Sequence, residues 1–315
     1  MFNESYIGII NDTIQNHLND FLKETPIIKK LCEHVLLNGK RIRPCITIDI
    51  CNTLSNCEYS NYLASLSVEY IHTASLIVDD LPCMDNAKTR RKQTCIHLKY
   101  GEASAQIASV TLLSLAINSL FKNILTMKEN NITNEQHILE INTYIMKEFS
   151  NVLYNTSHGQ LMDLNKLLNS CNLKEHSNEN LQTLLSNGNG NDNDDIITII
   201  KKKTGSFFEM SFIIGYLFGK GDISKIDKIK DLSFHFSMIY QILDDIEDME
   251  EDLINNKRNT YINYALHFGM YKTMYDFKKH FISFNKLLNQ LNLNSVFFID
   301  LTNHLKDKFD FLTFN

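Results

Sequence analysis

The chain has very few residues that interrupt helices, with only 3 prolines and 11 glycines among its 315 residues. Proline lacks a backbone donor and glycine loses the most conformational entropy on folding, so both are disfavoured inside helices. Apolar residues recur at helical spacing in residues 46–54, 63–78, 107–125, 138–153 and 207–218. The sequence therefore predicts an all-α fold.

The chain has no visible internal repeat and no shift in composition, which predicts a single domain over residues 1–315. The exception is the stretch at about 165–196, which contains a polar, low-complexity run at residues 186–195. Such a run has too few apolar side chains to order itself against a core. We therefore expect a flexible insertion there.

The overall composition excludes several functions. A formal net charge of -6 argues against a nucleic-acid binder, and 7 cysteines without a CxxC pair indicate reduced thiols rather than disulfides or a zinc site. Residues 1–22 lack the apolar core of a signal peptide, and no apolar run is long enough to span a bilayer. We expect no transmembrane segment, and a location in the cytoplasm or, with a targeting segment outside this sequence, a plastid-type organelle.

A first group of carboxylates follows an apolar helical pattern that ends at Asp79 and Asp80, with Pro82 and Asp85 close behind. Adjacent carboxylates repel each other, and a divalent cation would relieve that repulsion. Magnesium suits such a group, because it takes few protein carboxylates and completes its octahedron with water and phosphate oxygens. A solvated acidic helix end would have the same residues, so both interpretations stay open for this motif alone.

A second group, Asp244, Asp245 and Asp248, lies in another helical pattern. Asp244 and Asp248 are four residues apart and must share one helix face, where like charges destabilise the helix. The pair again indicates a cation, although a solvated acidic face remains the alternative. The two motifs together are much less expected by chance than either one alone.

Basic residues suited to diphosphates occur in the chain together with these carboxylates. Lys40, Arg41 and Arg43 lie at a glycine-led helix entry, and Arg90 and Arg91 follow the first acidic motif. Arginine binds phosphate oxygens in a bidentate way, and lysine supplies a point charge. Each cluster by itself could be ordinary surface, but their combination with the carboxylates predicts a diphosphate ligand.

These residues resemble those of the trans (head-to-tail) prenyl diphosphate synthases, which make farnesyl, geranylgeranyl and longer polyprenyl diphosphates. The resemblance covers residues 36–269 and rests on six ordered motifs: GKRIRP at 39–44, IHTASLIVDDLPCMD at 71–85, RR at 90–91, GQLMDL at 159–164, KTG at 203–205 and QILDDIED at 241–248. It implies one bundle of long helices around a central cavity, a homodimer, and condensation of isopentenyl diphosphate with dimethylallyl, geranyl or farnesyl diphosphate.

The resemblance also implies a role for each matched residue. Six carboxylates are expected to hold magnesium, with three ions per site when substrate is bound and the two motifs facing each other: Asp79, Asp80, Asp85, Asp244, Asp245 and Asp248. The expected diphosphate ligands are Lys40, Arg43, His72 and Arg91 for isopentenyl diphosphate, Arg90 for the allylic diphosphate, and Arg258. Lys203, Thr204 and Gln241 are expected to stabilise the allylic cation with weakly nucleophilic oxygens.

Product length is expected to depend on Ala74 and Ser75, about one turn before Asp79, where the growing tail would pass. Farnesyl-type relatives commonly have a bulky aromatic residue at the place of Ala74, so the methyl group predicts geranylgeranyl or longer products.

A terpene cyclase is an alternative, but it would not need Lys40, Arg43 and His72. A non-catalytic regulatory subunit is another, but such subunits usually lose one acidic motif. An interaction protein with coincidental acidic patches is the third.

Overall fold

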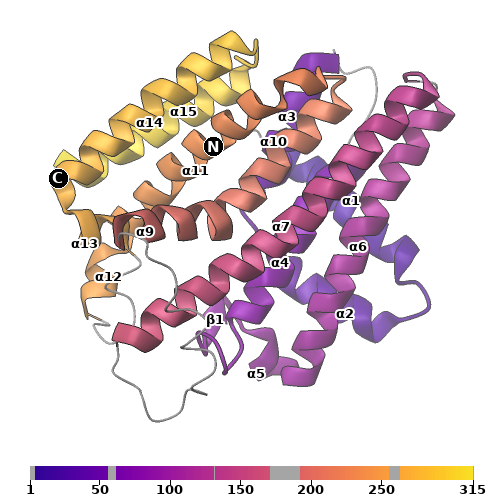
Figure 1. Ribbon diagram of the computed structural model, residues 1–315. Coiled ribbons are helices and arrows are strands. Elements are labelled where there is room, and N and C mark those ends of the chain that lie inside the picture. Colours follow the sequence, from indigo (N-terminus) through magenta and orange to yellow (C-terminus); the bar gives the residue numbers. More distant parts are fainter. Residues whose placement is uncertain (1–3, 56–61, 131, 171–191, 255–262, 315) are drawn as a thin grey trace. The chain divides into compact units, whose positions relative to one another are not determined.

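The computed structural model describes residues 4–55, 62–130, 132–170, 192–254 and 263–314, and nearly all of them are helical (Figure 1). The elements up to residue 129 are α1 (Glu4–Phe21), α2 (Pro26–Leu36), α3 (Ile42–Ser55), α4 (Tyr62–Asp79), the strands β1 (Thr89–Arg90) and β2 (Gln93–Thr94), α5 (Ile96–Tyr100) and α6 (Glu102–Glu129). They are followed by α7 (Glu135–Ser170), α9 (Asp192–Ile200), the π-helix η1 (Lys201–Gly205), α10 (Ser206–Phe218), the 3-10 helix η2 (Ile223–Lys225), α11 (Ile226–Glu247), α12 (Met249–Ile254), α13 (Tyr264–Phe268), α14 (Met270–Gln290) and α15 (Val296–Phe314).

The predicted all-α fold is confirmed, and the five segments with helical periodicity lie within α3, α4, α6, α7 and α10. The small antiparallel hairpin β1–β2 was not predicted. In the stretch at about 165–196, residues 171–191 lie outside the described residues, whereas both flanks are helical because α7 reaches Ser170 and α9 begins at Asp192. The flexible insertion therefore stays a prediction.

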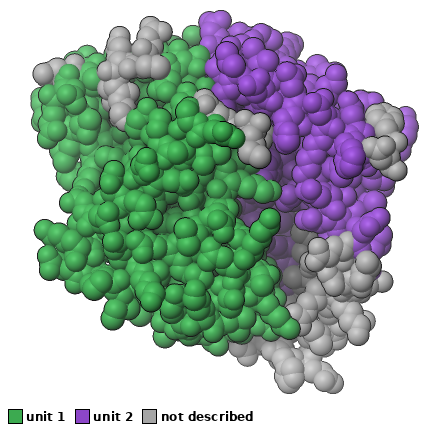
Figure 2. Space-filling view, turned by 180° about the vertical axis from the view of Figure 1, so that it is seen from behind, with its two compact units in different colours: residues 1–146, 210–225 green, residues 147–209, 226–315 purple. Residues whose placement is uncertain are grey.

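The chain forms two compact units, which Figure 2 shows in green and purple. Unit 1 consists of residues 1–146 and 210–225, and unit 2 of residues 147–209 and 226–315, so that α7 and α10 contribute residues to both. The first acidic motif belongs to unit 1 and the second to unit 2. A single domain over residues 1–315, with the two motifs facing each other, stays a prediction.

Unit 1 is built on α4, which packs along α6 and against α3. The helix α3 is buried over most of its length, and residues 210–218 of α10 pack closely on it. A Cβ added to Gly215 would lie 2.6 Å from the carbonyl oxygen of Thr47, so only glycine allows this approach. Unit 1 thus packs together α3, which carries Arg43, and α4, which ends at Asp79.

Unit 2 is built on α11, which packs against α14 and α15. The contact is largely aromatic: the ring of Phe284 lies 5.4 Å from that of Phe236 and 6.1 Å from that of Phe298, between ring centroids. All three side chains are fully buried. Aromatic rings remove large apolar areas from water, so this cluster anchors the helix that ends in the second acidic motif.

The helix α6 is, among the described residues, the one that is long and apolar enough to cross a membrane by length and composition. In its most apolar 18-residue window, 44% is buried inside the structure. Ala105, Ala108 and Leu112 are fully buried in the packing of unit 1. A core helix satisfies the same criteria as a membrane span, so the expected lack of a transmembrane segment stays a prediction.

A histidine pair joins α11 to α14 and has a consequence for stability. The Nδ1 atoms of His235 and His280 are 2.8 Å apart, so at least one ring must be neutral. The pKa of His280 is lowered to about 4, first by burial and then by the charges of His235, Lys279 and Lys272. The charge of Asp276 opposes this shift. Burial and Lys279 also lower the pKa of His235, against the opposing charge of Asp231.

Because the folded-state pKa of His280 lies below its ordinary value of 6.5, the unfolded chain binds its proton first as the pH falls. The stabilisation is complete above about pH 6.5 and is lost as the pH falls towards about 4. We expect the free energy of unfolding to drop by about 1–2 kcal/mol over that range, measured by urea denaturation. The variant His280→Gln should flatten the profile; an unchanged slope would show that other groups cause it.

Candidate functional site

The first acidic motif forms a tight loop at the end of α4. The helix ends at Asp79, as predicted, and the Asp85 N–H donates to the Asp79 carbonyl at 2.9 Å. The Leu81 carbonyl accepts from the N–H groups of Met84 and Asn86 in the same loop. Asp85 therefore returns to the end of α4, next to Asp79. Asp79 is half-buried and Asp85 is exposed, so both carboxylates are accessible to a hydrated cation.

Asp80, by contrast, is buried and binds protein partners. Its Oδ1 accepts from Nε and NH2 of Arg90 at 2.9 and 2.6 Å, and its Oδ2 accepts from the Cys95 thiol at 3.4 Å. Burial would lower the pKa of Arg90, but the hydrogen bonds and charge of Asp80 raise it overall. Asp80 thus holds a charged Arg90 in place, and its role as a magnesium ligand stays a prediction.

The two adjacent arginines lie on the hairpin β1–β2, whose register pairs Arg90 with Gln93. Arg91 and Lys92 lie between Arg90 and Gln93 and have φ values of 52° and 63°. Two-residue hairpin turns of this kind require positive φ at both positions, which usually selects glycine or asparagine. Here two cationic residues adopt that strained conformation. The turn presents Arg91 directly beside Arg90.

Four of the predicted diphosphate ligands lie close together in unit 1. Burial, followed by the positive charges of Arg43, Arg91 and Arg90, lowers the pKa of His72 well below its ordinary value. His72 is therefore neutral at physiological pH and can still donate one hydrogen bond. Lys40 is exposed in the loop that leads into α3. Arg43, Arg90 and Arg91 thus form a cationic cluster around the neutral side chain of His72.

A pocket with about 370 Å³ of empty space, partly open to solvent, lies beside this cluster within unit 1. It is lined by His34, Val35, Leu37, Thr73, Leu76, Ile77, Asp80, Arg90, Arg91, Gln93, Thr94, Cys95 and Ile96. The buried Thr73 hydroxyl has no hydrogen-bond partner among the described residues. The predicted tail-binding residues Ala74 and Ser75 are not among the residues that line this pocket. Ser109 of α6 donates to the carbonyl of the buried Ala74, and Ser75 donates to the His72 carbonyl.

In unit 2, three of the predicted catalytic residues, Thr204, Gln241 and Asp245, form one chain of hydrogen bonds. The Thr204 hydroxyl on η1 donates to Oε1 of Gln241 at 2.8 Å, and Nε2 of Gln241 donates to Oδ1 of Asp245 at 2.8 Å. The other oxygen of Asp245 accepts from the Tyr264 N–H at 2.8 Å. The π-helix η1 widens the backbone at this point, a feature that often marks functional sites.

The three aspartates of the second motif differ in environment. The Asp248 N–H donates to the Asp244 carbonyl at 2.9 Å, so the two residues share one helix face, as predicted. Asp244 is half-buried and Asp248 exposed, whereas Asp245 is buried. Burial raises the pKa of Asp245 to about 7, helped by the charges of Asp244 and Asp252 and opposed by the hydrogen bonds from Tyr264 and Gln241. Asp244 and Asp248 are the more accessible carboxylates for a cation.

The motif GQLMDL at residues 159–164 was noted in the sequence without a role, and the structure gives it one. Asp163 Oδ2 accepts from Lys203 Nζ at 2.8 Å. Asp163 Oδ1, Gln160 Oε1 and Thr156 Oγ1 are buried with no hydrogen-bond partner among the described residues. Their spacing of four and three residues aligns them along one face of α7. Such a polar row can accept hydrogen bonds from bound water or from the water shell of a cation.

The remaining predictions concern the whole metal site and Arg258. Arg258 lies outside the described residues. Among the side chains that the structure describes, no group of three or more His, Cys, Asp or Glu residues is arranged to hold a metal. Magnesium does not require such a group, because it uses one or two carboxylates together with water and substrate phosphates. The accessible pairs Asp79/Asp85 and Asp244/Asp248 fit that type of binding.

Comparison with solved structures supports the fold. The geranyltranstransferase of Thermotoga maritima superposes with a TM-score of 0.70 at 22% identity, over 95% of this chain and 98% of that structure. A geranyltransferase from Legionella pneumophila gives a TM-score of 0.70 at 20% identity, over 97% of this chain and 98% of the other. At such low identity these likenesses show the fold, which is that of the isoprenoid synthases.

Comparison with curated proteins gives sequence relatives from plants and a virus. Geranylgeranyl pyrophosphate synthases 3 (chloroplastic) and 4 of Arabidopsis thaliana are 29% and 30% identical over 72% and 75% of this chain, which spans 57% of the length of each. A trans-prenyltransferase of African swine fever virus is 26% identical over 91% of this chain and 82% of its own length. The profile of the polyprenyl synthetase family matches residues 25–261. This chain belongs to the polyprenyl synthetase family.

Proposed function

We propose that this protein condenses isopentenyl diphosphate with an allylic diphosphate and releases geranylgeranyl or a longer trans-polyprenyl diphosphate and pyrophosphate. The observation that carries the proposal is the cationic cluster of Arg43, Arg90 and Arg91 around His72 in unit 1, beside the accessible carboxylates of the first motif. A diphosphate needs several cations at once, and two of these arginines, Arg90 and Arg91, lie on the short hairpin β1–β2.

The carboxylates would hold magnesium, whose charge stabilises the diphosphate as it leaves the allylic substrate. Asp79, Asp85, Asp244 and Asp248 are the accessible candidates, and Asp80 would act by keeping Arg90 charged and directed. Arg43, Arg91 and His72, with Lys40, would bind the diphosphate of isopentenyl diphosphate. No nucleophilic side chain takes part.

The allylic cation would be stabilised by oxygens that attack it poorly. Gln241 Oε1 accepts from Thr204 and its amide nitrogen donates to Asp245, which fixes the dipole of the carboxamide. The ion pair of Lys203 with Asp163 anchors the same π-helix. The double bond of isopentenyl diphosphate then attacks the allylic cation and forms the new C–C bond. The resulting cation loses a proton to the released pyrophosphate.

The test is an elongation assay. The protein is incubated with magnesium, labelled isopentenyl diphosphate and, separately, dimethylallyl, geranyl and farnesyl diphosphate, and the products are sized by chromatography. We expect chains of four or more isoprene units from at least one primer. Products that stop at farnesyl would overturn the proposed product length alone, whereas cyclised products without isopentenyl consumption would favour a terpene cyclase.

The variant Ala74→Phe is expected to shorten the product by at least one isoprene unit, measured by product chromatography. The side chain of Ala74 is 2% exposed on α4, about one turn before Asp79, and an aromatic ring there would fill space needed by the tail. Ala64→Phe is the matched control, because it overpacks another buried alanine of the same helix and should change stability without changing product length. Unchanged product lengths in Ala74→Phe would refute this tail-binding position.

We also propose a homodimer formed through α6. One face of this helix exposes large apolar side chains at helical spacing: Ile107, Val110, Ile117, Phe121 and Leu125. A continuous exposed apolar row is typical of a protein interface. Size-exclusion chromatography with light scattering should give twice the monomer mass, and Phe121→Lys should lower the measured mass towards that of the monomer.

The proposed location is the cytoplasm or a plastid-type organelle.

A further inference from the structure

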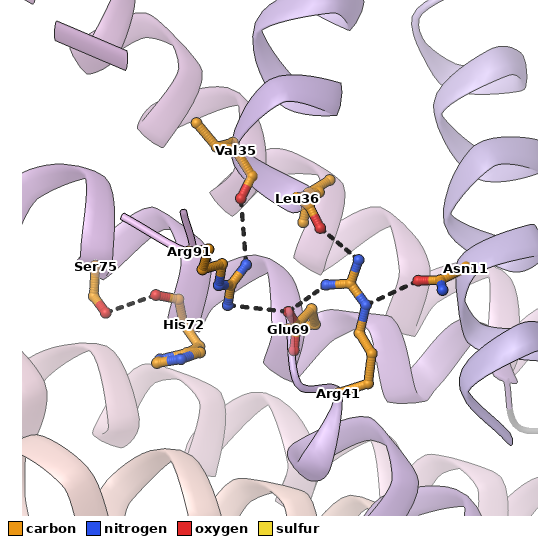
Figure 3. A network of polar contacts seen from close by, with 8 residues as sticks. All are labelled: Asn11, Val35, Leu36, Arg41, Glu69, His72, Ser75 and Arg91. Atoms are coloured by element: carbon orange, nitrogen blue, oxygen red, sulfur yellow. Dashed lines mark hydrogen bonds and ion pairs between the residues drawn. The ribbon is translucent and has the colours of Figure 1, made fainter. Parts of the chain in front are cut away.

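A buried carboxylate outside all the predicted site residues binds two arginines at once (Figure 3). Glu69 of α4 is 2% exposed, and its Oε1 accepts from Arg41 NH1 at 2.6 Å and from Arg91 NH2 at 3.3 Å. One negative charge therefore faces two positive ones in a site from which water is largely excluded. A buried charge of this kind is costly unless it is paired, so all three side chains are held by one another.

The two arginines are not held equally. Arg41 is 5% exposed and also donates to Asn11 Oδ1 at 3.0 Å and to the Leu36 carbonyl at the end of α2. Arg91 makes two longer contacts, each of 3.3 Å, to Glu69 and to the Val35 carbonyl. Arg41 is thus the fixed partner of Glu69. Arg91 is aimed by the same carboxylate but keeps donors and positive charge for another anion.

The same ion pair also supports the loop before α3. A Cβ added to Gly39 would lie 2.4 Å from Arg41 NH1 and 2.7 Å from Glu69 Oε1, so the backbone of Gly39 rests directly on the pair. The next residue is Lys40, and Arg43 follows in the first turn of α3. Glu69 therefore contacts both parts of unit 1 that carry the proposed ligands of isopentenyl diphosphate, the hairpin turn and the loop before α3.

We infer that Glu69 is a positioning residue for the isopentenyl diphosphate site, acting through Arg91 and the loop at Gly39. The inference rests on the proposed function. It distinguishes Arg41 from its basic neighbours Lys40 and Arg43, because Arg41 neutralises Glu69 and does not bind substrate. The allylic diphosphate depends instead on Arg90, which is held by Asp80, so the two substrates should respond differently to a change at Glu69.

The test is steady-state kinetics of Glu69→Gln, which keeps the size of the side chain and removes its charge. We expect the KM for isopentenyl diphosphate to rise about tenfold or more, with kcat and the KM for the allylic substrate changed less than about threefold. Glu33→Gln, which removes an equal charge from a partly exposed pair with Lys29 on α2, is the matched control and should change none of these values. Equal changes in both KM values, or a loss of kcat alone, would show a merely structural role.

Two further variants keep the inference testable if Glu69→Gln folds poorly. Arg41→Met combined with Glu69→Gln removes both buried charges, so folding should recover while the KM for isopentenyl diphosphate stays high. In an Arg91→Gln background, Glu69→Gln should raise that KM less than it does alone, since the two residues act through one contact. Fully additive effects would overturn the inference.

Failure of the proposed function would look different, because the unmodified protein would then elongate no primer. In that case, calorimetric titration with inorganic pyrophosphate still tests the positioning role. We expect Glu69→Gln to weaken pyrophosphate binding about tenfold relative to the unmodified chain and to Glu33→Gln. Equal affinity of all three proteins for pyrophosphate would contradict the positioning role of Glu69.

Discussion

Turnover is expected to fall at least about a hundredfold when either Asp79 or Asp244 is replaced by alanine. Each carboxylate lies at the accessible end of a helix, Asp79 at the last residue of α4 and Asp244 in the last turn of α11. Neither belongs to the apolar core, so the helical content should stay that of the unmodified chain. The loss would come from the charge that holds magnesium against the leaving diphosphate.

The measurement combines product formation at saturating magnesium with circular dichroism of the same samples. Asp307→Ala on α15 is a matched control, because it removes an exposed aspartate from a helix that carries no proposed site residue. Raised magnesium should restore part of the activity of the more conservative Asp79→Asn and Asp244→Asn variants. Near-normal turnover in both alanine variants would exclude these aspartates as metal ligands.

Gly159→Ala is expected to lower kcat about a hundredfold, because it pushes the π-helix out of place. A Cβ at this position would lie 2.9 Å from the backbone nitrogen of Lys203 and 2.9 Å from Cβ of Lys202. The backbone contact cannot be relieved by turning a side chain, so α7 and η1 must separate. Small displacements of groups around a reacting centre cost rate steeply.

The effect should appear in kcat rather than in the KM for isopentenyl diphosphate, whose proposed ligands belong to unit 1. Gly8→Ala is the control: it makes the same change on α1, where nothing lies within 4 Å of the added atom, and alanine favours a helix over glycine. A Gly159→Ala enzyme with unchanged kcat would show that the position of η1 does not limit the reaction.

The sequence predicted those parts of the fold and site that local patterns determine. Long apolar periodicities with few prolines correctly gave α3, α4, α6, α7 and α10, and the paired carboxylates correctly marked the end of α4. The i, i+4 spacing of Asp244 and Asp248 also correctly placed both on one helix face. These features need only the geometry of one helix.

Other features depend on contacts between residues far apart in sequence. Nothing in the spacing of Glu69 indicates that it pairs with Arg41, 28 residues away, and with Arg91, 22 residues away. The pairing of Asp80 with Arg90 was equally hidden, since an acidic motif followed by arginines fits separate ligands as well as an ion pair. The π-helix at residues 201–205, which packs closely on Gly159, has no local signature in the sequence.

The proposed reaction is tested most directly by the incorporation of labelled isopentenyl diphosphate into prenyl products, with geranyl or farnesyl diphosphate as primer, in magnesium and in excess chelator. The account predicts incorporation with magnesium, extending to four or more isoprene units, and none with the chelator. Equal incorporation with the chelator would contradict the magnesium site. No incorporation with any allylic primer would contradict the proposed function itself.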